Sequence, residues 1–244
     1  MFSIQKLSIM TYAKVAGLLY LLIAIAGGFS IGYVPTVISV PGDAVATAAA
    51  LSSNGWLLKL GIVADIFVLL CEVVLTVMLY HLFKHVSKTL ALVATFARFA
   101  MSIIMSLNLV NLLVPLLLLS GAAYLQVFSE VQLQSLSLLF LEIHQYGIYI
   151  WGMFFGLHLA ALGYLIINSG YFPKFLGYCM GIGSLGYAGE AVVKFTIPDN
   201  EVVGFGIGVL LVIAVIGELG FTFWLLIKGI DAKTWEEFAL KTNK

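Results

Sequence analysis

Charged side chains are scarce in this sequence. Only 10% of its 244 residues are Asp, Glu, Lys or Arg, and arginine occurs once, at Arg98. A soluble domain carries about 25% charged residues, so this chain lacks what a water-exposed surface needs. Its 12 basic and 12 acidic residues cancel to a formal net charge of zero. No basic surface is left to neutralise phosphates, and we exclude nucleic acid as a partner.

Cysteine and catalytic motifs are equally sparse. Cys71 and Cys179 lie in separate apolar runs without a CxxC or CxxH arrangement, which favours packing as small hydrophobic side chains. No metalloprotease, nucleophile-elbow or phosphate-loop motif is present, and the glycine run 204–208 opens an apolar segment rather than a nucleotide-binding turn. We predict no cofactor and no metal. The question of enzyme activity stays open, with the sequence leaning against it.

What the sequence has instead is long apolar runs, since 62% of its residues are hydrophobic. A spanning helix needs about 20 mostly apolar residues, and it satisfies every backbone polar group internally. We therefore predict an all-α fold, a polytopic transmembrane helical bundle that forms a single transmembrane domain over residues 1–244. About six spans are expected, near Val15–Val34, Leu58–Leu82, Leu90–Leu119, Tyr146–Ile167, Phe175–Val193 and Gly204–Ile227.

The loops between these runs alternate between lysine-rich and lysine-poor. Only Lys59 and Lys194 fall on one side. Cytoplasmic loops carry the excess of basic residues, so we predict a multi-pass protein of the cell (plasma or inner) membrane with both termini in the cytoplasm. The lysines on the predicted cytoplasmic side are Lys6, Lys14, Lys84, Lys88, Lys174, Lys228, Lys233, Lys241 and Lys244.

Two segments outside the runs have helical patterns of their own. Asp43 precedes an alanine-rich stretch over Ala44–Leu51, and Ser129 followed by Glu130 precedes leucines at helical spacing over Val131–Ile143. Both are predicted to be short interfacial helices on the outer face, lying on the membrane rather than crossing it.

Small residues recur four positions apart, for example at Gly28/Gly32 and Gly177/Gly181. Such pairs allow helix backbones to approach closely in lipid.

The partners we expect are membrane lipid together with a second copy of the chain or a partner membrane subunit. A small-molecule substrate cannot be named from the sequence.

Ionisable residues inside the spans are the candidate functional groups, because a charge at the bilayer centre costs about 2.5–3.5 kcal/mol on insertion scales. At roughly 1.5 Å rise per residue, one set falls near the midplane and a second set falls nearer the outer surface. The midplane set is Glu72, Arg98, His158 and Glu218, and the outer set is Asp65, Asn108, Asn111, His144 and Glu190, with Glu142 closer to the surface.

Spacing ties the two sets together. Asp65 and Glu72 are seven residues apart and His144 and His158 fourteen, so each pair shares a helix face. Together the two sets predict a polar path through the interior of the bundle. Glu72 is the first expected partner for Arg98 and Glu218 the second, because a guanidinium held by carboxylates loses much of its burial cost.

Two hypotheses follow for these residues. In the first, they form a solute or proton pathway, so that the chain is a small translocating membrane protein. In the second, they are a packing network in an accessory or scaffold protein that binds lipid or a partner subunit. An intramembrane enzyme, or a haem protein using His144 and His158, is a lesser alternative, since the histidine spacing suits stacked haems but second axial ligands at matching depths are missing.

Several segments also resemble a known family in their order and spacing. They are the run Lys14–Leu22, Gly32–Pro35, Pro41–Asp43, Phe155–His158 and Ser169–Lys174. Together they resemble the bacterial domain-of-unknown-function 4386 family, from Lys14 into the final helix, with a looser match after Gly186. The resemblance implies a multi-pass membrane protein without an established activity. It carries over no catalytic or binding residues.

Overall fold

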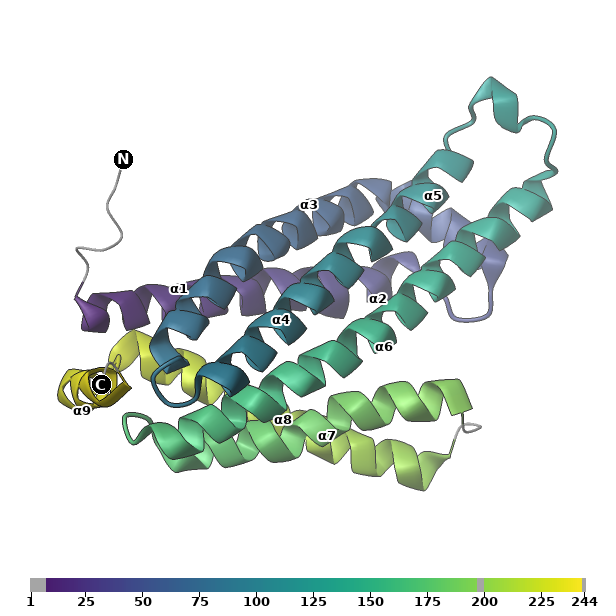
Figure 1. Ribbon diagram of the computed structural model, residues 1–244. Helices are drawn as coiled ribbons and strands as arrows, with labels where there is room; N and C mark the ends of the chain where they lie inside the picture. Colours follow the sequence, from purple (N-terminus) through teal and green to yellow (C-terminus); the bar gives the residue numbers. More distant parts are fainter. Residues whose placement is uncertain (1–7, 197–199, 243–244) are drawn as a thin grey trace. The chain divides into compact units, whose positions relative to one another are not determined.

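The predicted all-α fold is confirmed. The computed structural model describes residues 8–196 and 200–242, and throughout this part the regular elements are helices (Figure 1). Lys6, Asp199 and Lys244 lie outside the described residues. The elements are α1 (Ile9–Gly27), the π-helix η2 (Gly28–Tyr33), α2 (Val34–Ile38), α3 (Ala44–Phe83), α4 (Lys88–Asn108), α5 (Val110–Leu118), the 3-10 helix η3 (Ala123–Leu125), α6 (Glu130–Ser169), α7 (Lys174–Thr196), α8 (Glu201–Ile227) and α9 (Ala232–Thr242).

Five stretches of the described residues are long and apolar enough to cross a membrane, and each overlaps one predicted span, with only Leu119 of Leu90–Leu119 falling outside its stretch. The sixth predicted span, Phe175–Val193, lies within α7, a 23-residue helix that is diluted by glycines and by Glu190. Its crossing of the membrane stays a prediction. The five stretches are Ile9–Ile38, Ala44–Phe83, Lys88–Leu118, Glu130–Ser169 and Glu201–Ile227.

The first predicted interfacial helix is a helical segment that joins a span at a kink. It forms the beginning of α3, where the Asp43 carboxylate accepts a hydrogen bond from the backbone N–H of Ala46 at 2.9 Å as a cap. The helix then runs to Phe83 with one non-helical residue, Asn54, at φ −121° and ψ 20°. Ser52, Ser53 and Asn54 all donate to carbonyls four residues back, a pattern that bends helices. The predicted boundary therefore corresponds to a kink.

The second predicted interfacial helix, by contrast, is continuous with a span. Ser129 and Gln132 form a capping box: the Ser129 hydroxyl accepts from the Gln132 backbone N–H, and the Gln132 side chain accepts from the Ser129 N–H. From there α6 runs 40 residues to Ser169, about 60 Å at 1.5 Å per residue. Because the hydrocarbon core is only about 30 Å thick, a helix of this length extends beyond it. The prediction of a separate short helix is therefore wrong for Val131–Ile143, and that either segment lies on the membrane stays a prediction.

The chain divides into two compact units, described separately below. Unit 1 comprises residues 1–22, 71–102 and 151–244, and unit 2 comprises residues 23–70 and 103–150. The divisions fall inside α1, α3, α4 and α6. The prediction of a single transmembrane domain stays a prediction.

Glycines bring the helices of unit 1 into backbone contact. A Cβ added to Gly163 on α6 would meet the Gly177 carbonyl oxygen at 2.6 Å, and one on Gly183 of α7 would overlap the backbone of Ala214 on α8. Successive contacts run in opposite directions along α7 and α8, so the two pack antiparallel (Figure 1). The pair Gly28/Gly32, by contrast, has nothing within 4 Å of an added Cβ, so it makes no close contact among the described residues.

Helix α9 closes one end of unit 1 and was not among the predicted elements. Asp231 caps it by accepting from the Thr234 N–H and hydroxyl, and these bonds hold the pKa of the exposed Asp231 carboxyl below its usual range. Trp235 Nε1 and the Tyr171 hydroxyl both donate to the backbone oxygen of Leu82, at 3.1 and 2.7 Å. That oxygen belongs to the last turn of α3, where carbonyls lack helical partners.

Unit 2 is built around an apolar core and an irregular turn. Buried Val34, Ile38, Leu58, Ile62 and Leu112 belong to this core. The π-helix η2 stands directly before α2, which has a proline in its first turn. Proline cannot donate to the carbonyl four residues back, and a π-turn changes the hydrogen-bond register at this point. Such turns occur often at functional sites.

The glycine contacts give a matched test on one helix. We expect Gly177→Ala to lower the free energy of unfolding by about 1–3 kcal/mol, the usual cost of overpacking, because its Cβ would meet Gly163 O at 2.5 Å and Ile167 Cγ1 at 2.7 Å. Gly181→Ala, whose Cβ meets nothing within 4 Å, should be neutral or gain up to about 1 kcal/mol of helix propensity. Unfolding titrations in mixed detergent–SDS micelles measure both. Equal effects from the two substitutions would contradict this packing.

Candidate functional site

The predicted pairing of Arg98 with Glu72 is confirmed in unit 1. Arg98 of α4 donates from Nη2 to Glu72 Oε1 of α3 at 3.0 Å. Its Nε lies 2.6 Å from Glu72 Oε2, but this N–H is not aligned as a hydrogen bond, so the second contact is electrostatic. Arg98 is 1% exposed and Glu72 5%. Two opposite charges this deeply buried stabilise each other only because they are in contact.

The other guanidinium nitrogen has partners that the sequence did not reveal. Arg98 Nη1 donates to the Tyr20 hydroxyl at 3.0 Å and contacts His158 Nε2 at 2.9 Å. The Arg98 Cζ also lies 4.8 Å from the Tyr20 ring centroid, a cation–π contact. Since arginine has no acceptor, His158 Nε2 must accept, and His158 Nδ1 donates to the Ala94 carbonyl at 2.9 Å. These partners assign a neutral Nδ1–H imidazole.

This group, which we name the Arg98 cluster (Tyr20, Glu72, Ala94, Arg98 and His158), is buried and leaves little free space beside it. The void beside it measures about 10 Å³, close to the minimum for one water molecule. Both ring nitrogens of His158 are engaged, so neither a haem iron nor a travelling proton could use them without breaking a bond. The cluster has the properties of a structural network.

Two further predicted residues of unit 1 are not part of this ion pair. Glu218 of α8, the second expected partner of Arg98, interacts with the guanidinium electrostatically, and it accepts a hydrogen bond from the Tyr187 hydroxyl at 3.4 Å. Glu190 is partly buried toward the end of α7. Its predicted membership of one layer with Asp65, a residue of unit 2, stays a prediction.

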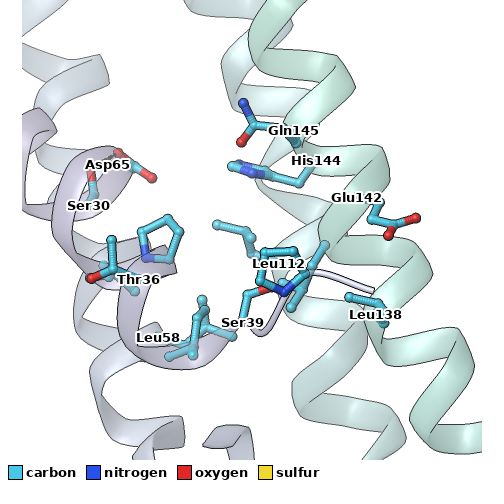
Figure 2. A pocket seen from close by; sticks show the side chains of 16 residues that line it. Ser30, Thr36, Ser39, Leu58, Asp65, Leu112, Leu138, Glu142, His144 and Gln145 are labelled. Atoms are coloured by element: carbon cyan, nitrogen blue, oxygen red, sulfur yellow. Dashed lines mark hydrogen bonds between the residues drawn. The ribbon is translucent and has the colours of Figure 1, made fainter. Parts of the chain in front are cut away.

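Unit 2 contains a cavity of about 500 Å³. Figure 2 shows Asp65 and Ser30 on one side of it and His144 and Gln145 on the other. We call it the Asp65 cavity. Its lining residues are Ser30, Val34, Pro35, Thr36, Ile38, Ser39, Pro41, Leu58, Gly61, Asp65, Leu112, Leu138, Leu141, Glu142, His144 and Gln145.

Asp65 is held in place by the π-helix. The Ser30 hydroxyl donates to Asp65 Oδ1, and both side chains are buried, at 7% and 4% exposure. The part of the chain that the structure describes places no ion-pair partner at Asp65. A carboxylate without a cation at membrane depth is costly, so Asp65 is suited either to carry a proton or to face a positively charged ligand.

His144 faces the cavity from α6 with its Nε2 buried and without a hydrogen-bond partner. Its backbone is fixed from the other side, because Asn108 donates to the His144 carbonyl at 2.8 Å and itself accepts from Asn111 at 2.9 Å. Gly147 makes room for this link, since a Cβ there would overlap the Asn108 side chain. Asn108 and Asn111 therefore position α6 rather than line the cavity.

The Asp65 cavity combines an apolar wall with a rim of polar groups. Among its lining residues, Thr36, Pro41, Glu142 and Gln145 are exposed, which places them where the cavity opens. Lysine and arginine are absent from the lining. Mostly apolar clefts with a few convergent polar groups are typical of small-molecule sites.

Sequence reasoning missed Ser30, Tyr20 and Tyr187, each of which is a hydrogen-bonding partner of a predicted residue. A weak signal existed for Ser30, which lies five residues before Pro35 and between two glycines. For the tyrosines the sequence gives no signal beyond their position inside an apolar run.

Replacing one charged residue of the Arg98–Glu72 pair should lower the stability of the protein far more than replacing both. We expect Arg98→Met to lower the free energy of unfolding by about 3–5 kcal/mol, because Glu72 is left buried and unpaired. The double variant Arg98→Met with Glu72→Gln should recover most of this loss. Thermal denaturation in detergent compares the two, and a double variant no more stable than the single one would argue against the pairing.

Comparison with known proteins identifies the family of the chain. The family described as "Domain of unknown function (DUF4386)" matches residues 15–229. An uncharacterized protein of the archaeon Archaeoglobus fulgidus is 39% identical over 77 residues, which cover 32% of this chain and 43% of that protein. No solved structure matches the chain. With its long apolar helices the chain is a membrane protein, and it belongs to the domain-of-unknown-function 4386 family.

Proposed function

We propose that this protein translocates a small solute or protons across the cell membrane and that the Asp65 cavity is its binding site. The observation that carries the proposal is the meeting of two buried ionisable side chains, Asp65 and His144, in one cavity of about 500 Å³. Ionisable residues in membrane spans commonly mark ion and substrate pathways.

The two side chains differ from those of the Arg98 cluster in what they leave unsatisfied. The Asp65 carboxylate has a hydroxyl partner but no ion-pair partner among the described residues. His144 Nε2 has no partner there at all. A buried polar atom without a partner costs free energy, and a bound ligand, a proton or water in the cavity would relieve that cost.

The membrane and orientation belong to the same proposal. The lysine-rich loops support a topology with both termini in the cytoplasm. The cavity lies in the unit that contains the turns around Pro41 and Ser120, which are on the lysine-poor side in this topology. It would then be reached from outside the cell.

A second candidate function is an accessory protein that binds lipid or a partner subunit. The observation in its favour is the Arg98 cluster, where charges at membrane depth are satisfied internally and leave room for about one water. For those residues we propose the structural role. The ionisable side chains of the Asp65 cavity are not satisfied by each other in this way. The cavity therefore favours translocation over a purely structural role.

Proton flux tests the proposal in reconstituted vesicles that contain a trapped pH-sensitive dye. Under a potassium diffusion potential, wild-type vesicles should change internal pH faster than protein-free vesicles. Asp65→Asn should return the rate to that of protein-free vesicles, because it removes the carboxylate but keeps the shape and the Ser30 contact. His144→Gln should reduce the rate as well.

Glu130→Gln is the matched control, since it also removes one carboxylate in unit 2. Glu130 is exposed and accepts only from the Gln134 side chain in the described structure, so its replacement should leave the flux unchanged. Monodisperse elution of each variant in detergent establishes folding. Wild-type flux no faster than that of empty vesicles would overturn proton translocation.

A further inference from the structure

We propose that the Asp65 cavity binds an alkylammonium ion, a primary or secondary amine in its protonated form with an apolar body. This inference deepens the proposed function, since it names the chemical class of solute for the same cavity. It rests on the lining residues, on their charge and on the acceptor atoms that they leave open.

The charge of the lining selects a cation. Asp65 is buried, Glu142 lies at the exposed rim, and no lysine or arginine accompanies them. Opposite charge is what a buried carboxylate without an ion-pair partner requires. A carboxylate or phosphate ligand would meet two like charges and would find one neutral or protonated histidine as its only compensation.

The apolar wall selects an organic cation over a metal ion. Val34, Ile38, Leu58, Leu112 and Leu141 supply hydrocarbon surface rather than oxygen ligands. A hard cation such as Ca²⁺ needs six to eight oxygen atoms, and the described residues contain no group of three or more His, Cys, Asp or Glu placed to hold a metal. A volume of about 500 Å³ is that of a site for a small organic molecule.

The open acceptors select an amine that still carries N–H groups. Asp65 Oδ1 already accepts from Ser30, while Oδ2 has no hydrogen-bond donor among the described residues. His144 faces the cavity from the opposite wall (Figure 2), and in its neutral Nδ1–H tautomer Nε2 would accept a hydrogen bond. The several N–H groups of an ammonium ion can donate to such acceptors. A quaternary ammonium ion has no N–H and is usually held by aromatic cages, yet the lining contains no Phe, Tyr or Trp.

Calorimetric titration of the protein in zwitterionic nanodiscs tests this with four six-carbon probes that differ only in their head groups. The probes are hexylammonium, hexyltrimethylammonium, hexanol and hexanoate, titrated in phosphate buffer to avoid competing amines, with empty nanodiscs as the blank. Hexylammonium should bind at least about tenfold more tightly than each of the others, as hydrogen bonds to charged groups allow. Equal affinity for all four, or preference for another head group, would overturn the proposal.

Variants locate the binding. Asp65→Asn should weaken hexylammonium binding about thirtyfold or more, as loss of one partner of a buried charge pair does. Glu142→Gln at the rim should weaken it roughly two- to fivefold, as expected for an exposed pair. Glu130→Gln should bind like the wild type. If Asp65→Asn fails to fold, the Glu142→Gln result decides, and unchanged affinity in that variant would refute the assignment.

Binding and flux can fail separately, because the titration uses no gradient. Hexylammonium binding in a protein that carries no proton flux would refute proton translocation and leave the ligand class intact. Flux without selective hexylammonium binding would refute the ligand class alone.

Discussion

The charge of Arg98 cannot be removed by deprotonation in a protein, so the groups around it have to meet that charge inside a bundle surrounded by hydrocarbon. Glu72 supplies the opposite charge, Tyr20 supplies a hydroxyl and a ring face, and His158 supplies a lone pair. The chain of hydrogen bonds ends at the Ala94 carbonyl. Segments of α1, α3, α4 and α6 are thereby fixed to one side chain, and helix register in unit 1 depends on it.

Close backbone packing is the second requirement in unit 1, because lipid gives helices no hydrophobic reason to associate. Gly163 meets Gly177, and Gly183 meets Ala214, at distances that no side chain would permit. Polar links hold the helices at particular points, and the glycines let the backbones between those points approach. The two effects stabilise different contacts and are therefore separable by substitution.

The Asp65 cavity follows the opposite arrangement. The Arg98 cluster gives each charged group a partner, whereas the cavity leaves Nε2 of His144 without one and Asp65 with only a hydroxyl. Asn108 fixes the backbone at His144 and Ser30 holds Asp65. Asp65 and His144 are thus held in position while part of their hydrogen-bonding capacity stays unused. A ligand can bind to that unused capacity. Burial of charge alone would not have distinguished these two groups of residues.

The sequence by itself determined that the chain is helical and membrane-spanning, because span length and apolarity are properties of consecutive residues. It also determined the caps at Asp43 and Ser129 and the partner of the single arginine, since few carboxylates were available. It did not reveal that the helix capped at Asp43 leads into a span through a kink at Asn54, or that the helix capped at Ser129 runs without a break into the span of α6. Hydropathy falls at a polar segment whether or not the helix ends there.

Only the tertiary structure decided which polar residues are saturated and which face a cavity. In lipid both faces of a spanning helix are apolar, so periodicity does not report which face points inward. Asp65 and His144 come from helices far apart in the chain, and Ser30 reaches Asp65 from a π-turn that no residue pattern announced. Because they line one cavity only through the packing of distant segments, the pattern of neighbouring residues in the sequence does not predict their arrangement.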